Sequence, residues 1–158
     1  MAQTEKDSEI MADAEKAKAT LIAKDAGIKV FFDNSSGYAI FPNVGKGGLI
    51  VGGASGNGVV YENGVAVGMA SLKKVNVGLQ AGGQAVIQVI FFETEVALEE
   101  FKEGNYEFSA EASAVIAEEG KSKDASYDDG VIVFTLPKAG LMADASIGGQ
   151  KFEYDPFE

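Results

Sequence analysis

Three lysines are the residues of this chain whose type and position could do chemistry with a partner. Lys46 lies in the Gly-rich stretch 45–48, and Lys73 and Lys74 are adjacent in a region rich in strand-like segments. Ammonium groups bind anions such as phosphate as compact point charges. Together the three lysines predict a small basic patch. A strand edge protected by lysines is the alternative interpretation.

The composition excludes most familiar catalytic chemistry. The 158 residues include no Cys, His, Arg or Trp, so thiolate nucleophiles, His-based triads and bidentate Arg forks are absent. The acidic residues do not have EF-hand spacing. A formal net charge of −11 repels nucleic acid. We therefore expect no enzyme activity, cofactor, metal site or nucleic-acid partner.

The first 25 residues are predicted to form an amphipathic helix. Ile10, Ala14, Ala17 and Leu21 recur at helical spacing, and Ser8 is the expected N-cap. This apolar stripe could pack against the rest of the domain or contact a lipid surface. The candidate lipid-binding residues are therefore Lys46, Lys73, Lys74, Ile10, Ala14 and Leu21.

From Tyr38 onward, two-residue periodicity and Gly-rich turns predict a β-rich region. Asn63 and Gly64 are expected to form the type I′ turn of a hairpin. A surface helix is expected at 94–102, with Thr94 as its N-cap. The predicted strands are 38–41, 48–52, 58–61, 65–70, 75–79, 85–92, 106–116, 131–136 and 141–147.

These segments predict a single α+β domain, with the amphipathic helix in residues 1–25 and a β-rich domain in residues 26–158. The expected sheet is antiparallel and strongly coiled, closed or nearly closed as a barrel or sandwich. The N-terminal helices and one mid-chain surface helix would cover it. Many strands alternate small residues with larger ones, which allows tight sheet packing or a ligand cavity.

An ordered set of segments resembles the SYLF domain family, from about residue 26 to residue 154. The matching pieces are GYAIFPNVGKGG, GGASGNGVVYENG, VGLQAGGQ, FFETEVALEEF, FSAEASA and GLMADASIGGQKF. The resemblance implies a non-catalytic binding domain. Eukaryotic members are associated with phosphoinositide membranes and actin, and bacterial relatives that stand alone are frequently exported or lipid-anchored. Lipid binding in the eukaryotic members is attributed to an amphipathic N-terminal helix and basic surface residues.

The expected function is therefore a lipid- or membrane-associated binding module. A protein-interaction or envelope-scaffold domain, including actin-type association, is the alternative, so a protein partner is also considered. No apolar run approaches the length of a membrane span. The expected location is the cytoplasm, or the periplasm or cell envelope if a leader has been removed.

Overall fold

The computed structural model describes residues 5–45, 54–74, 85–138 and 146–157. The helices are α1 (Glu5–Lys24), α2 (Ile28–Asn34), α3 (Glu95–Lys102) and the short 3-10 helix η1 (Lys121–Asp124). The strands are β1 (Gly37–Val44), β2 (Ala54–Glu62), β3 (Val65–Lys74), β4 (Val86–Phe92), β5 (Tyr106–Glu107), β6 (Val115–Ile116), β7 (Val131–Pro137) and β8 (Gln150–Pro156). The predicted α+β class is confirmed.

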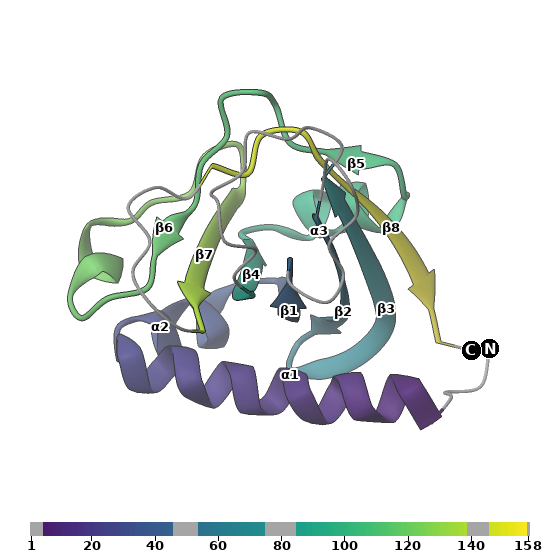
Figure 1. Cartoon of the computed structure of the whole chain (residues 1–158). Coiled ribbons are helices and arrows are strands. Elements are labelled where there is room, and N and C mark those ends of the chain that lie inside the picture. Colours follow the sequence, from purple (N-terminus) through teal and green to yellow (C-terminus); the bar gives the residue numbers. More distant parts are fainter. Residues whose placement is uncertain (1–4, 46–53, 75–84, 139–145, 158) are drawn as a thin grey trace.

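The strands form one sheet in the order β5-β8-β3-β2-β1-β4-β7-β6. Figure 1 shows this sheet curled above α1, which confirms the expected coiling. The expectation of an antiparallel sheet is wrong in one place, because β6 pairs with β7 in parallel. Full closure into a barrel stays a prediction.

The parallel pair arises where one strand was expected at 106–116. The structure instead has β5 and β6 at opposite edges of the sheet. Between them the Phe108 amide donates to the Gln150 carbonyl at 3.0 Å, and the Ile147 amide donates to the Ala112 carbonyl at 3.1 Å. This segment therefore leaves β8 at one edge and reaches β7 at the other, where its direction matches that of β7.

Both faces of the sheet are covered with apolar side chains. Along β1, Tyr38 and Ile40 belong to one hydrophobic cluster, while Ala39 and Phe41 belong to a second cluster. This alternation follows from the opposite orientation of successive side chains in a strand. The first cluster lies between the sheet and the helices α1 and α2, and the second contains the buried residues of α3. β4 is buried along its whole length, as expected for a strand covered on both faces.

Curling of the sheet brings β8 into contact with strands that are not its neighbours. The Phe41 and Phe152 rings lie 5.6 Å apart, although β1 and β8 are separated by two strands. Gln88 and Gln150 exchange two side-chain hydrogen bonds, at 2.7 and 3.1 Å, and both are buried. The reciprocal pairing satisfies two amides that would otherwise be costly to bury.

The local turn predictions are confirmed in two places. Asn63 and Gly64 have φ values of 54° and 81°, as a type I′ hairpin requires. The Thr94 side chain caps α3 by accepting a hydrogen bond from the Ala97 amide at 3.2 Å. Ser8 was expected to be the N-cap of the first helix, but it lies inside α1, which includes residues from Glu5.

Some predicted strands cannot be compared with the structure. The segments 48–52 and 75–79, and most of 141–147, lie outside the described residues. Conversely, β8 was not predicted as a strand, although Phe152 and Tyr154 alternate with charged residues in it.

Candidate functional site

Strand register brings one set of strand ends together. Lys74 of β3 pairs with Gln150 of β8, and Val86 of β4 pairs with Pro137 of β7. β1, β3 and β7 finish at this end of the sheet, and β2, β4 and β8 begin there. We call it the lysine end because Lys73, Lys138 and Lys151 lie in or beside these strand ends. The other end is called the carboxylate end.

Lys73 is the predicted patch residue whose side chain the structure describes. It is exposed on β3, between β2 and β8, so it does not protect a sheet edge. Lys46 lies outside the described residues, and so does the side chain of Lys74. The three-lysine patch therefore stays a prediction.

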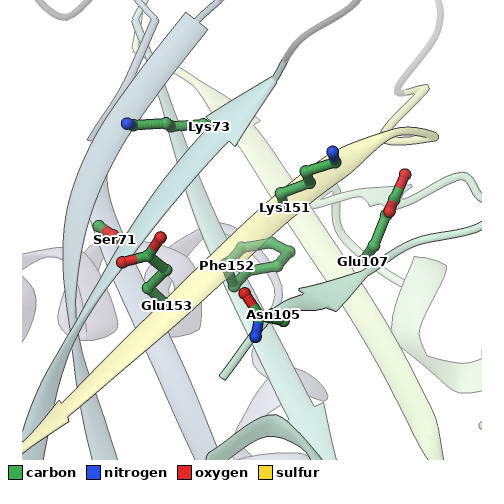
Figure 2. Close-up of a pocket in the computed structure, with 7 residues that line it drawn as sticks. All are labelled: Ser71, Lys73, Asn105, Glu107, Lys151, Phe152 and Glu153. Atoms are coloured by element: carbon green, nitrogen blue, oxygen red, sulfur yellow. The ribbon is translucent and has the colours of Figure 1, made fainter. Parts of the chain in front are cut away.

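The structure places a different lysine beside Lys73. Lys151 on β8 is its direct cross-strand partner, and Glu107 on β5 follows Lys151 in the same row. Directly opposed residues of neighbouring strands share one face of the sheet, where like charges are unfavourable. Figure 2 shows the two ammonium groups extending away from each other, as expected for like charges.

A shallow pocket of about 250 Å³ lies over this row. Glu153 and Ser71 form the next cross-strand pair on the same face, two residues along from Lys151 and Lys73. Both line the pocket, and so does Phe152 (Figure 2). The full lining is Ser71, Lys73, Asn105, Glu107, Lys151, Phe152 and Glu153. With two lysines and two glutamates, the pocket has the groups to hold a small anion only if the lysines turn toward it.

Sequence reasoning missed Lys151 for a clear reason. It lies far along the chain from Lys73, and only the pairing of β3 with β8 makes them neighbours. The alternation of residues 151–155 could have predicted a strand with Lys151 on its polar face. The partner strand could not be identified from that pattern.

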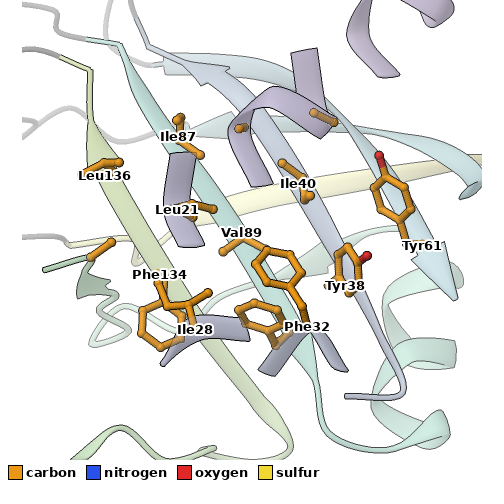
Figure 3. Close-up of a cluster of buried hydrophobic side chains, with 14 of the residues drawn as sticks. Leu21, Ile28, Phe32, Tyr38, Ile40, Tyr61, Ile87, Val89, Phe134 and Leu136 are labelled. Carbon is orange, nitrogen blue, oxygen red and sulfur yellow. The ribbon is translucent and has the colours of Figure 1, made fainter. Parts of the chain in front are cut away.

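The candidate residues of α1 face the sheet. Ala14 and Leu21 are fully buried in the first cluster, and Ile10 packs against it while partly exposed. Figure 3 shows Leu21 among side chains of the sheet, including Ile40 and Val89. In this conformation the apolar stripe of α1 is therefore occupied by the protein's own core.

The contact between α1 and the sheet also contains polar groups. The Lys18 ammonium donates to the Tyr38 hydroxyl at 3.2 Å and lies 5.1 Å from the centroid of the Phe32 ring. Such cation–π contacts are modestly favourable. Burial raises the pKa of Tyr61, and the charge of Glu15 raises it further. The phenol of Tyr61 is therefore neutral at physiological pH.

Asp25 anchors the corner that follows α1. Its carboxylate is buried and accepts hydrogen bonds from the amides of Gly27, Ser122 and Gly120, at 3.1, 2.9 and 3.4 Å. Burial raises the pKa of Asp25, but these hydrogen bonds outweigh it, so the pKa lies below its usual value. The corner is thereby tied to η1, about a hundred residues later in the chain.

A notch separates α1 from the ends of β1, β4 and β7. Three lysines line it, namely Lys16 and Lys24 on α1 and Lys138 after β7. Its volume is about 560 Å³. The other lining residues are Asp13, Ala17, Thr20, Pro42, Asn43, Ile87, Leu136 and Pro137.

At the carboxylate end, where Glu62 ends β2, a lysine is ion-paired. The Lys102 ammonium lies 2.6 Å from a Glu62 carboxylate oxygen and 3.5 Å from one of Glu99. Partial burial lowers the pKa of Lys102, but the hydrogen bond and charge of Glu62 outweigh it, so the pKa is raised. Lys102 is therefore firmly charged and already neutralised by its neighbours.

An acidic groove of about 510 Å³ runs between residues 106–115 and the start of β7. Its four acidic residues are Glu107, Glu111, Asp128 and Asp129. Phe108, Ile132, Val133 and Ile147 are the buried residues that form its apolar floor. None of the described residues that line it is a lysine. The groove has the charge to attract a cation and the apolar surface to hold a side chain.

Within the described ranges, no group of acidic side chains is arranged to hold a metal ion.

Across the same ranges, no helix combines the length and apolar character needed to span a bilayer.

Comparison with known proteins identifies the family. Residues 73–156 match the family described as "Ysc84: Las17-binding protein actin regulator". The chain is also 29% identical over 144 residues to Beta cell expansion factor A of Aeromonas veronii. That alignment covers 90% of this chain and 54% of the relative, so the chain spans about half the length of the curated relative it matches.

The matched region is more than half of the chain and includes α3 and β4 to β8. The chain therefore belongs to the Ysc84 family, whose domain is also called SYLF. This confirms the resemblance found in the sequence. The family is one of binding domains.

Proposed function

We propose that this chain is a non-catalytic binding module that associates with anionic lipid surfaces through its lysine end. Family membership supports a binding role, since the SYLF family is lipid- and actin-associated. The proposed contact includes Lys73 and Lys151 on the sheet, with Lys138 beside them at the same end. Lys74, the last residue of β3, belongs to the same proposal. Lys46, two residues after the end of β1 in the sequence, is included in it as a prediction.

The proposal is carried by three lysines, Lys73, Lys138 and Lys151, that gather at one end of the sheet without an ion pair among the described residues. Among the described residues, the ion pairs are made by Lys29 and Lys102. The lysines of the lysine end make no such pair within the part of the chain that the structure describes. Their charge is available to an external anion, although the chain as a whole carries −11. A local excess of cations can attract an anionic membrane over about a Debye length, roughly 8–10 Å.

The apolar stripe of α1 has a second part in this proposal. Ile10, Ala14 and Leu21 can contact lipid only if α1 leaves the sheet, because two of them are fully buried. Only Ala14, Ala17 and Leu21 of its 20 residues are buried, so the helix is lightly anchored for its length. We therefore assign the first contact to the lysines and any insertion of α1 to a later step.

Vesicle flotation of the full chain tests the lysine contact. Lys73→Glu with Lys151→Glu should weaken binding to phosphatidylglycerol vesicles at least about thirtyfold, because each lysine near an anionic surface contributes roughly 1 kcal/mol and each new glutamate is repelled by it. Binding of the unaltered chain should weaken as salt is raised and should be absent with phosphatidylcholine vesicles. Unchanged binding of the double variant would contradict the lysine contact.

The matched control is Lys121→Glu with Lys123→Glu, which changes two lysines that make no ion pair among the described residues. Both lysines are exposed, and neither lines the pocket beside Lys73 or the notch beneath α1. The control makes the same change in net charge, so it should weaken binding only slightly. An equal loss in both double variants would show that total charge, and not the lysine end, governs the attraction.

A second candidate function is recognition of a protein partner, and the acidic groove favours it. The family description names Las17 binding and actin regulation, so a protein partner is consistent with membership. The four carboxylates above an apolar floor suit a segment that combines lysine or arginine with apolar side chains. Fluorescence anisotropy with a labelled Lys/Leu peptide tests this function, and Asp128→Lys with Asp129→Lys should abolish the binding.

A further inference from the structure

The notch between α1 and the strand ends has an apolar floor formed by α1 and by two strands of the sheet. Ala17 of α1 is 4% exposed, and Ile87 of β4 and Leu136 of β7 are 5% and 9% exposed. Ile87 and Leu136 are direct cross-strand partners, so they form one continuous surface. Figure 3 shows these two side chains together at one end of the first cluster. The part of the floor that these side chains form is apolar, so it suits the hydrocarbon part of a ligand better than a polar group.

The rim of the notch is cationic on both sides. Lys16 and Lys24 come from α1, where their spacing with Thr20 puts all three along one stripe of the helix. Lys138 comes from the opposite wall, and its ammonium donates to the Asn43 side-chain oxygen. Asn43 is the exposed residue of β1, so this bond holds Lys138 at the mouth.

Charge and size together select the class of ligand. Among the described residues of the rim, three lysines and one aspartate give an excess of two positive charges. A phosphate monoester carries about −1.5 to −2 at neutral pH, which matches this excess better than a carboxylate does. The volume of about 560 Å³ lies within the usual range of small-molecule pockets, roughly 300–1,000 Å³.

We infer that the notch binds one single-chain phosphate monoester amphiphile, with its phosphate on Lys16, Lys24 and Lys138 and its hydrocarbon chain along Ala17, Ile87 and Leu136. The inference deepens the proposed function, on which its ligand class rests, by giving the lipid a discrete site. The site uses α1 as it is packed in this structure. It therefore does not require α1 to leave the sheet.

Isothermal titration of the full chain with monododecyl phosphate, below the concentration at which it forms micelles, tests the inference. We expect saturable binding of one molecule. Ethyl phosphate, which has the same head without the long chain, should bind at least about tenfold more weakly. Dodecyl maltoside, which has the chain without the charge, should also bind at least about tenfold more weakly. Equal binding of either probe would overturn the inference.

Two variants locate the site. Lys16→Ser with Lys138→Ser removes one cation from each wall and should weaken monododecyl phosphate binding about tenfold or more. Lys121→Ser with Lys123→Ser removes the same charge from exposed lysines outside the notch and should change the affinity less than about twofold. Unchanged affinity in the first variant, or an equal loss in both, would overturn the inference.

Thr20→Phe tests the site with a variant that is expected to fold normally. Thr20 is exposed and lines the notch, so a phenyl group there should obstruct the hydrocarbon chain while leaving the lysines in place. Its affinity for monododecyl phosphate should fall to that of ethyl phosphate, with an unchanged circular dichroism spectrum. Full affinity in this folded variant would contradict the placement of the chain.

The two proposals can fail independently. Vesicle flotation that depends on Lys73 and Lys151, without saturable binding of monododecyl phosphate, would leave the membrane contact standing and remove the notch. Saturable binding in the notch without vesicle flotation would support the notch and remove the membrane contact.

Discussion

α1 and α3 cover opposite faces of the same sheet but are attached to it very differently. α3 buries Ala97, Leu98 and Phe101 from only eight residues. The Phe101 ring lies 5.1 Å from that of Phe92 and 5.4 Å from that of Phe152. α1 buries three residues from 20, and two of them are alanines.

The lysines of the two helices also differ in whether they are ion-paired. Lys102 at the end of α3 is neutralised by Glu62 and Glu99, whereas Lys16 and Lys24 of α1 line an open notch. α3 is therefore a structural cover whose charges are used within the fold. α1 is a cover whose charges are available to a ligand. The difference supports the proposal that a ligand binds on the side of the sheet covered by α1.

Truncation of the main anchors should produce the largest effects. Phe101→Ala should lower the free energy of unfolding by about 3–5 kcal/mol and Leu21→Ala by about 2–4 kcal/mol, because each leaves a cavity. Urea unfolding followed by circular dichroism measures both. A smaller loss from Phe101→Ala than from Leu21→Ala would break the contrast between the two helices.

Removing the Asp25 carboxylate at the corner that follows α1 should have the next largest effect. Asp25→Ala leaves three backbone amides without their acceptor and should cost about 2–3 kcal/mol. Because the folded pKa of Asp25 is lowered, its stabilising contribution is complete above the ordinary carboxyl pKa of about 3.9. The contribution is lost as the pH falls through the lower folded pKa.

Unfolding midpoints across an acid pH series check the Asp25 contribution. The difference between the unaltered chain and Asp25→Ala should shrink only below about pH 4. A difference that is constant with pH would show that Asp25 acts by packing and not through its charge.

The paired and unpaired lysines should respond differently to neutral replacement. Lys102→Met should cost about 1 kcal/mol, since it removes a partly buried ion pair with Glu62 that solvent screens in part. Lys16→Met should change stability by less than about 0.5 kcal/mol. Equal costs in urea unfolding would contradict the distinction between structural and available charges.

The smallest effect concerns the lysine pair on β3 and β8. Lys73→Thr removes a like-charge neighbour of Lys151 and should raise stability by about 0.2–0.5 kcal/mol at low salt, because the other direct partner of Lys73 is the uncharged Ser55. The gain should disappear at high salt, because screening already weakens the repulsion. Thermal unfolding at two salt concentrations measures it, and a loss of stability at low salt would show that Lys73 is paired in solution.

The turn and helix signals could be interpreted from the sequence because they depend on near neighbours. The Asn63-Gly64 turn and the Thr94 cap are decided within four residues, and both are confirmed. The start of α1 was placed wrongly at Ser8 because a capping residue is also tolerated within a helix. The sequence predicted one strand at 106–116, but the structure has two, β5 and β6. They are separate strands because they pair at opposite edges of the sheet, which no local pattern in the sequence indicates.

By itself the sequence determined the family, the α+β class, and the absence of Cys, His and Arg chemistry, because composition and local pattern are sufficient for these. Only the tertiary structure decided which lysines are neighbours. Lys73 meets Lys151, and Lys138 meets Lys16 and Lys24 around one notch, through strand order and helix packing. These contacts join residues far apart in the chain, and no local preference encodes such a pairing.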